Sequence, residues 1–107
     1  MSTAPSAEVL RMTDLVSYQE GSVVSRQITK ADAGNVTLFA FDLGQELTEH
    51  TAPYDALTHV LEGQAEIRLG GKPFVLQAGE AIVMPANVPH ALKALARFKM
   101  LLTMIRA

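Results

Sequence analysis

Residues 79–90, with the sequence G-E-A-I-V-M-P-A-N-V-P-H, constrain the fold more than any other part of the chain. Gly79 can adopt the positive φ of a tight turn, and Ala81–Met84 has the apolar run of a buried strand. Two prolines then enclose Asn87, a residue type that tolerates the left-handed backbone region. The pattern predicts a turn, a short strand and a rigid corner that carries His90 to the mouth of a β-barrel.

The chain from Ser22 onward has short β-favouring segments separated by turn residues, which favours an all-β sandwich or barrel over an alternating βαβ arrangement. Residues 91–95 are rich in Ala and Leu, but they follow a proline directly and precede another β-favouring run, so a strand is favoured over a helix. The strands are predicted at residues 23–29, 36–42, 47–52, 56–61, 65–69, 74–76, 81–84, 91–95 and 98–106.

Turn signals divide these strands. Glu62-Gly63 and Gly70-Gly71 each separate two apolar runs, and both are predicted to be tight hairpins. Near the N-terminus, Thr13 is predicted to cap one short helical turn. Residues 1–8 are small and polar and are expected to be loose.

Size and composition limit the classes of protein. The 107 residues, 49% of them hydrophobic, predict one domain over residues 1–107. A net charge of -2 and scattered Lys and Arg argue against nucleic acid as a partner. No apolar run reaches the roughly 20 residues of a membrane helix, and the N-terminus lacks the pattern of a secretion signal, so a cytoplasmic location is expected. The absence of cysteine leaves histidines, carboxylates and hydroxyls to carry any chemistry.

Several strands are apolar on both faces. In residues 36–41, for example, Val36, Leu38 and Ala40 alternate with Phe39 and Phe41. A small barrel needs only one apolar face, so the second face predicts a homodimer formed by sheet-to-sheet contact. The alternative is that the N-terminal segment folds over this second face.

A glycine, a proline, a turn residue and a histidine stand at Gly79, Pro85, Asn87 and His90. In this spacing the chain resembles the small single-domain cupins, over about residues 44–94. Asn87 replaces the glycine of their second motif, and Ala94 stands where the motif closes with asparagine. The resemblance implies an all-β fold, an antiparallel double-stranded β-helix or jelly-roll barrel, here with a short N-terminal helical turn.

The first cupin motif is only partly present. Gly44, His50 and the closing Glu62-Gly63 match it, whereas Ala52 stands at its second histidine and Ala56 at its glutamate. In metal-dependent cupins, the two histidines and the glutamate of the first motif, together with the second-motif histidine, bind one divalent ion, typically iron, manganese, nickel or zinc. This chain keeps only His50 and the second-motif histidine as metal ligands, and two imidazoles alone rarely hold a metal.

Strand alternation bears on a third ligand. It places His50, Ala52, Ala56, Thr58 and Val60 on the inner face, whereas His59 points outward unless a bulge shifts the register. Asp55 is the best-placed carboxylate, although an aspartate beside a proline more often bonds the backbone. Methionines are soft donors but are mostly core residues. The further candidates near the mouth are Gln45, Glu46, Glu49 and Tyr54, and the methionines are Met84, Met100 and Met104.

The two alanines in the first motif predict a roomy, apolar ligand pocket that suits a small molecule with one oxygen-bearing end. Two functions stay open: a cupin-type enzyme, with a metal or a histidine acting on a small organic substrate, and a metabolite-binding or sensing module that has lost the metal site. A third alternative is an assembly domain in which the two histidines bond through water. The predicted pocket residues are His50, Ala52, Tyr54, Ala56, Thr58 and His90.

Overall fold

The computed structural model describes residues 3–106 and is built almost entirely of β-strands. The antiparallel jelly-roll prediction is confirmed, and each of the nine predicted strands is present with both ends within two residues of those expected. In the described part of the chain, no helix has the length and apolar character needed to cross a bilayer. The elements are η1 (Met12–Asp14), β1 (Val23–Ala31), β2 (Gly34–Phe41), β3 (Glu46–His50), β4 (Tyr54–Glu62), β5 (Gln64–Leu69), β6 (Lys72–Gln77), β7 (Ala81–Met84), β8 (His90–Ala94) and β9 (Phe98–Arg106).

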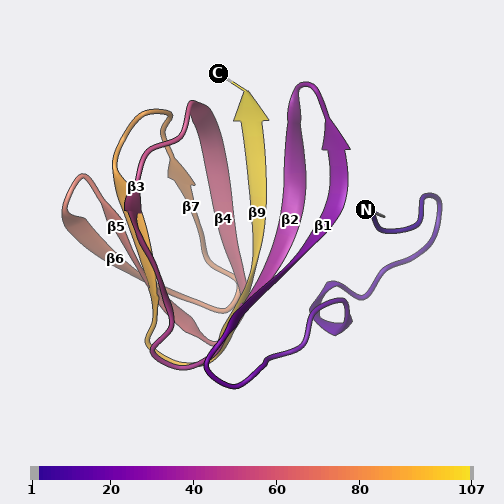
Figure 1. Ribbon diagram of the computed structural model, residues 1–107, viewed down its shortest axis with the longest axis horizontal. Helices are drawn as coiled ribbons and strands as arrows, with labels where there is room; N and C mark the ends of the chain where they lie inside the picture. The colour runs from indigo at the N-terminus through magenta and orange to yellow at the C-terminus, as the bar shows by residue number, and fades with distance from the viewer. Residues whose placement is uncertain (1–2, 107) are drawn as a thin grey trace.

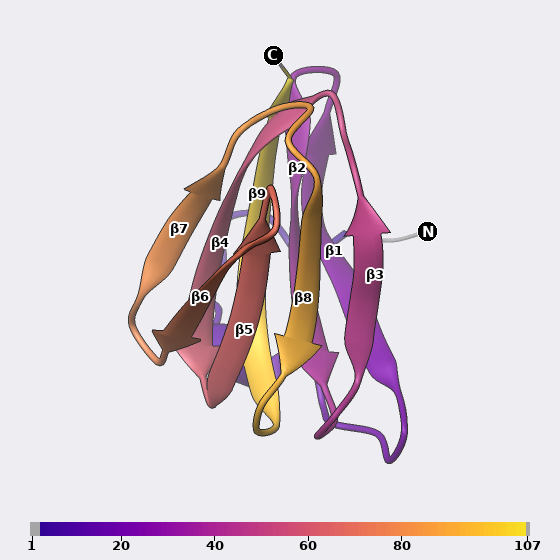
Figure 2. The ribbon, with the colours of Figure 1, turned by 90° about the vertical axis from the view of Figure 1, so that its left-hand side faces the viewer.

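The strands form two antiparallel sheets. One has the order β1-β2-β9-β4-β7 and the other β3-β8-β5-β6. The sheets lie close together where β4 passes into β5, and they diverge toward the end that carries the β7–β8 loop, which we call the mouth (Figure 1). Figure 2 faces the four-stranded sheet and shows β3 ending, and β8 beginning, at the mouth.

The core lies between the sheets. In β4, Ala56, Thr58 and Val60 are buried while Leu57 is exposed, so the predicted inner and outer faces of this strand are correct. At the narrow end, Phe41 and Phe98 stack with ring centroids 4.4 Å apart. The buried residues of this core are Phe41, Ala56, Val60, Ala65, Ile67, Leu76, Met84, Leu92, Ala94, Phe98 and Met100.

The hairpin predicted at Glu62-Gly63 is wrong. β4 pairs with β7 and β9, whereas β5 pairs with β6 and β8, so the chain crosses from one sheet to the other at Gly63. Gly63 has a φ of 83°, and a Cβ there would overlap the carbonyl oxygen of Arg97. The turn residues correctly predict a positive φ but not which sheet the next strand joins. The second predicted hairpin, at Gly70-Gly71 between β5 and β6, is confirmed.

The segment of residues 12–18, which we call the N-terminal strap, covers part of the outer face of the five-stranded sheet. Val16 is buried there together with Leu38 and Ala40. The strap contains the predicted helical turn as one 3-10 turn, but Thr13 lies inside the turn and no side chain caps its start. The strap therefore accounts for much of the second apolar face of the central strands.

The remaining apolar side chains of that outer face stay uncovered. Leu57, Val83 and Ile105 are 40%, 59% and 59% exposed, so the homodimer stays a prediction. Residues 1–2 of the expected loose terminus lie outside the described residues, and further along it the N–H of Ala4 donates to the carbonyl of Ile28 at 3.0 Å.

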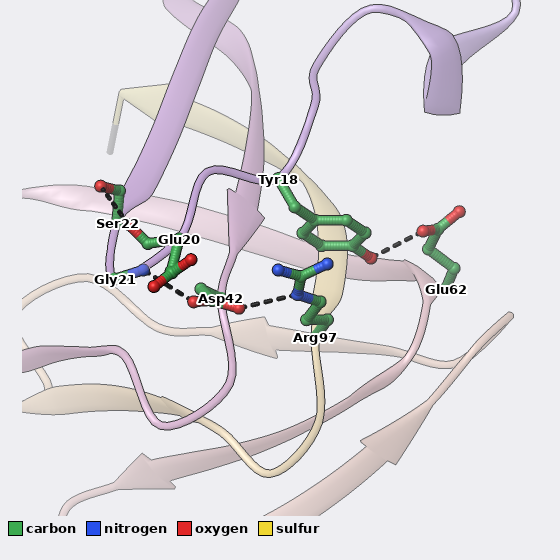
Figure 3. Close-up of polar contacts among 7 residues, drawn as sticks. All are labelled: Tyr18, Glu20, Gly21, Ser22, Asp42, Glu62 and Arg97. Carbon is green, nitrogen blue, oxygen red and sulfur yellow. Dashed lines mark hydrogen bonds and ion pairs between the residues drawn. The ribbon is translucent and has the colours of Figure 1, made fainter.

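Polar contacts fasten the strap at the narrow end (Figure 3). The Tyr18 hydroxyl donates to the Glu62 carboxylate at 2.6 Å. The Arg97 guanidinium and the Lys99 ammonium lie 5.3 Å and 5.0 Å from the centre of the Tyr18 ring. Burial and the bond to Glu62 raise the pKa of Tyr18. Lys99 also donates to the carbonyl of Thr13 at 2.6 Å, so both ends of the strap are held.

Asp42 joins the start of β1 to the loop between β8 and β9. Its carboxylate accepts the N–H of Gly21 at 2.7 Å and the Nε–H of Arg97 at 2.7 Å (Figure 3). These two donors, the Gly21 amide foremost, lower the pKa of Asp42 to about 2. The carboxylate therefore stays charged at all but strongly acidic pH.

Candidate functional site

The structure brings His50 and His90 together at the mouth. They are directly opposed residues of β3 and β8, and their ring centroids lie 4.2 Å apart in an edge-on arrangement with 64° between the planes. His90 is 8% exposed, whereas His50 is exposed. One imidazole is therefore anchored in the barrel wall, and the other lies against it on the solvent side.

A β-bulge aims His50 at His90. Leu47 opposes Leu92 and His50 opposes His90, so β3 uses one more residue than β8 over the same distance. Without the extra residue, strand alternation would place Leu47 and His50 on opposite faces. Sequence reasoning missed this bulge, although two successive polar residues, Thr48 and Glu49, separate Leu47 from His50 and are a signal for it.

The corner before His90 is tied to the rest of the mouth. The N–H of Ala86 donates to the Asp55 carboxylate at 2.9 Å, and the N–H of Asn87 donates to the carbonyl of Ala52 at 2.8 Å. Asn87 has a φ of 65°, the left-handed conformation predicted for it. A third bond joins the carbonyl of Pro89 to the β5–β6 turn at 2.8 Å. These contacts restrict the corner and thus the position of the histidine that follows it.

Hydrogen bonds to the backbone two residues earlier in the chain define the tautomers of both rings. Nδ1 of His50 lies 2.8 Å from the carbonyl oxygen of Thr48, and Nδ1 of His90 lies 3.3 Å from that of Val88. Because a carbonyl oxygen can only accept, each Nδ1 carries the proton. In the neutral ring, each Nε2 then has a free lone pair.

Nε2 of His90 is accessible even though the residue is mostly buried. This atom has no hydrogen-bond partner among residues 3–106. Within the same residues, every fully buried side-chain nitrogen or oxygen has a hydrogen-bond partner. This nitrogen therefore keeps contact with solvent. Burial lowers the pKa of His90, the bond to Val88 opposes this effect, and the neighbouring His50 adds to it. The net lowering favours the neutral ring at neutral pH.

The donor set does not fit a resident metal with three protein ligands. Within residues 3–106, no group of three or more His, Cys, Asp or Glu residues is arranged to hold an ion. The Asp55 carboxylate bonds the corner, His59 shares the outer sheet face with Leu57, and Glu49 lies in the exposed bulge. Two imidazoles remain, fewer than the usual set for zinc or iron.

The methionines pack in the barrel instead. Met84 and Met104 oppose Ala56 from either side, on β7 and β9. The buried Thr58 hydroxyl donates to the Met84 sulphur at 3.7 Å. Met84 and Met100 belong to the buried core, and Met104 packs against it. Thioethers therefore fill the space beside the alanine that replaces the motif glutamate.

The other predicted pocket residues lie around and below the histidine pair. Ala56 and Thr58 are buried, and Ala52 and Tyr54 are partly exposed near the mouth. Three surface grooves lie away from the pair: on the outer face of the four-stranded sheet, beside the end of β9, and at the narrow end next to Arg97. A molecule in solution can therefore reach the predicted pocket at the mouth, where His50 is exposed and Ala52 and Tyr54 are partly exposed.

Both motif histidines fall in a segment with a known family likeness. Residues 37–105 match the cupin domain family. The chain belongs to the cupin family. This cupin is similar over its full length to a conserved protein of unknown function, SPY1581, from Streptococcus pyogenes, with 35% identity, a TM-score of 0.91 and coverage of 96% of that chain. A cupin superfamily protein from Desulfitobacterium hafniense shares 26% identity and a TM-score of 0.91, with 99% of this chain and 97% of that one covered.

Two further relatives are longer than this cupin. A cupin 2 conserved barrel domain protein from Leptotrichia buccalis is 39% identical with a TM-score of 0.88, over 91% of this chain and 47% of that one. The polyketide synthase CurC of Streptomyces cyaneus is 31% identical over 61 residues, which cover 56% of this chain and 40% of that protein. This cupin thus spans less than half the length of the curated relative it matches.

Proposed function

We propose that this cupin is a small-molecule-binding module whose ligand contacts His50 and His90 at the mouth of the barrel. The observation that carries the proposal is the orientation of the two rings: backbone carbonyls bond both Nδ1 atoms, and neither Nε2 has a partner among residues 3–106. A binding site needs a few fixed polar groups beside apolar surface. The restricted corner and the apolar interior beneath it supply both.

The donor set favours binding over metal-dependent catalysis. Metal-dependent cupin chemistry needs a third protein ligand, and the described residues provide only two imidazoles. A general base would need a partner that tunes its pKa, yet the ring of each histidine bonds only a neutral carbonyl. The non-catalytic alternative therefore has the stronger support.

Metal content of protein purified without chelator separates the two functions. We expect only trace iron, manganese, nickel and zinc. One equivalent of metal per chain, lost in His50→Ala and retained in His59→Ala, would instead establish a metalloprotein. His59 is a suitable control because its side chain lies on the outer face of the sheet.

Ligand binding is tested by NMR titration with a panel of small organic molecules. Polyketide-like phenols belong in this panel because of the relative that is named a polyketide synthase. We expect perturbed signals of His50 and His90 with at least one class of compound. If no compound perturbs either ring, binding at the mouth is refuted.

A further inference from the structure

We infer that the ligand of the mouth is a neutral hydrogen-bond donor, a molecule with O–H or N–H groups such as a phenol or a diol, rather than a carboxylate or a ketone. This inference rests on the proposed function and specifies its ligand class. Its basis is the hydrogen-bonding character of the two rings. Each neutral ring whose Nδ1 carries the proton offers an acceptor, and no donor, at Nε2.

The same geometry occurs at both rings. His50 in β3 bonds the carbonyl of Thr48, and His90 at the start of β8 bonds the carbonyl of Val88 in the preceding loop, in each case two residues earlier in the chain. Both rings therefore present the same kind of atom. Because the ring centroids lie 4.2 Å apart, one small ligand at the mouth is within reach of both rings.

The same two atoms disfavour a ligand that can only accept hydrogen bonds. A carboxylate or a ketone would place its own lone pairs against the lone pairs of the two Nε2 atoms, which is unfavourable in a partly desolvated site. Charge at the mouth does not select the ligand class, because the Asp55 carboxylate bonds the corner and Arg106 opposes Tyr54 at the end of β9.

The first test measures the tautomers directly. Long-range proton–nitrogen NMR correlations of the metal-free protein, in chelator-treated buffer, distinguish a proton on Nδ1 from one on Nε2. We expect the proton on Nδ1 in both rings. A proton on Nε2 in both rings would overturn the inference.

The second test compares matched probes. Resorcinol donates two hydrogen bonds, its dimethyl ether donates none, and benzoate is an anion of similar size. We expect resorcinol to bind at least about 5-fold more tightly than the ether or benzoate, as the loss of one or two hydrogen bonds implies. His50→Ala should abolish this preference, since His50 is exposed and its removal spares the core, while His59→Ala should keep it.

The outcomes separate the two proposals. If the ether or benzoate perturbs both rings and binds as tightly as resorcinol, the mouth is a binding site but the donor inference is wrong. If none of the three probes perturbs His50 or His90, the donor inference fails. In that case a positive result from the wider panel would still support the proposed function.

Discussion

Removal of the Tyr18 hydroxyl tests how the N-terminal strap is held. Tyr18→Phe keeps the ring between Arg97 and Lys99 but deletes the 2.6 Å bond to Glu62. A hydrogen bond to a charged group contributes about 1.5–3 kcal/mol, and partial exposure of this pair places it at the lower limit. We expect the free energy of unfolding to fall by about 1.5 kcal/mol, which for a domain of this size lowers Tm by about 6 °C.

Tyr18→Leu should cost more than Tyr18→Phe. It also removes the aromatic face over which the two cations lie, and each such contact contributes about 0.5–1 kcal/mol at an exposed site. The additional loss is then about 1–2 kcal/mol. The two variants thus separate the contribution of the hydroxyl from that of the ring.

Urea unfolding followed by far-ultraviolet circular dichroism measures these changes, since the chain has no tryptophan to report fluorescence. A double-mutant cycle with Glu62→Ala isolates the pair. We expect a coupling energy of about 1 kcal/mol between the Tyr18 hydroxyl and the carboxylate. A coupling below about 0.3 kcal/mol would show that this contact does not hold the strap, and the reasoning would be refuted.

Three further predictions concern stability and assembly. Gly63→Ala should lower the free energy of unfolding by more than about 2 kcal/mol, because the added Cβ would overlap a carbonyl oxygen. Gly71→Ala is the control, since Gly71 has a similar φ but open space around it, and it should cost about 1 kcal/mol. Equal losses of stability in thermal unfolding would contradict this prediction. The pKa of Asp42 is lowered from 3.8 to about 2, so the stability that this carboxylate contributes is complete above about pH 4 and is lost as the pH falls through 2. Asp42→Asn should therefore be less stable than the wild-type protein at pH 7. In acid-denaturation curves this difference should shrink between pH 4 and 2. If the exposed outer face forms a homodimer, light scattering should give twice the chain mass of 11.5 kDa. Val83→Lys, which places a charge on this face, should then give the mass of the monomer. A dimer mass retained in Val83→Lys would exclude this face as the interface.

The strands could be predicted because their signals are local. Alternating side chains and turn residues act over a few positions, so every strand was located, including β8 after its proline. The crossing at Gly63 was not predictable in this way, because a turn residue specifies backbone conformation and not the partner of the next strand. The contact of Tyr18 with Glu62, 44 residues apart, depends on the tertiary fold in the same way.

The candidate site was predictable in part. The spacing of the second motif located His90 and its corner, and the first motif located His50. The bulge in β3 that pairs them was missed, since alternation alone cannot show an extra residue. Asp55 was considered as a ligand, but its carboxylate bonds the backbone of Ala86, a contact between distant segments that no local pattern reveals.

The orientation of each imidazole is set by its own backbone, since the carbonyl that bonds Nδ1 belongs to the residue two positions earlier in the chain. No acidic neighbour is required to steer the ring, in contrast to sites where a carboxylate orients a histidine. Substitutions among the inward-facing side chains below the pair should thus leave the orientation of both Nε2 atoms unchanged. Under the proposed function, the ligand preference could then change through these lining residues while the two acceptor atoms stay fixed.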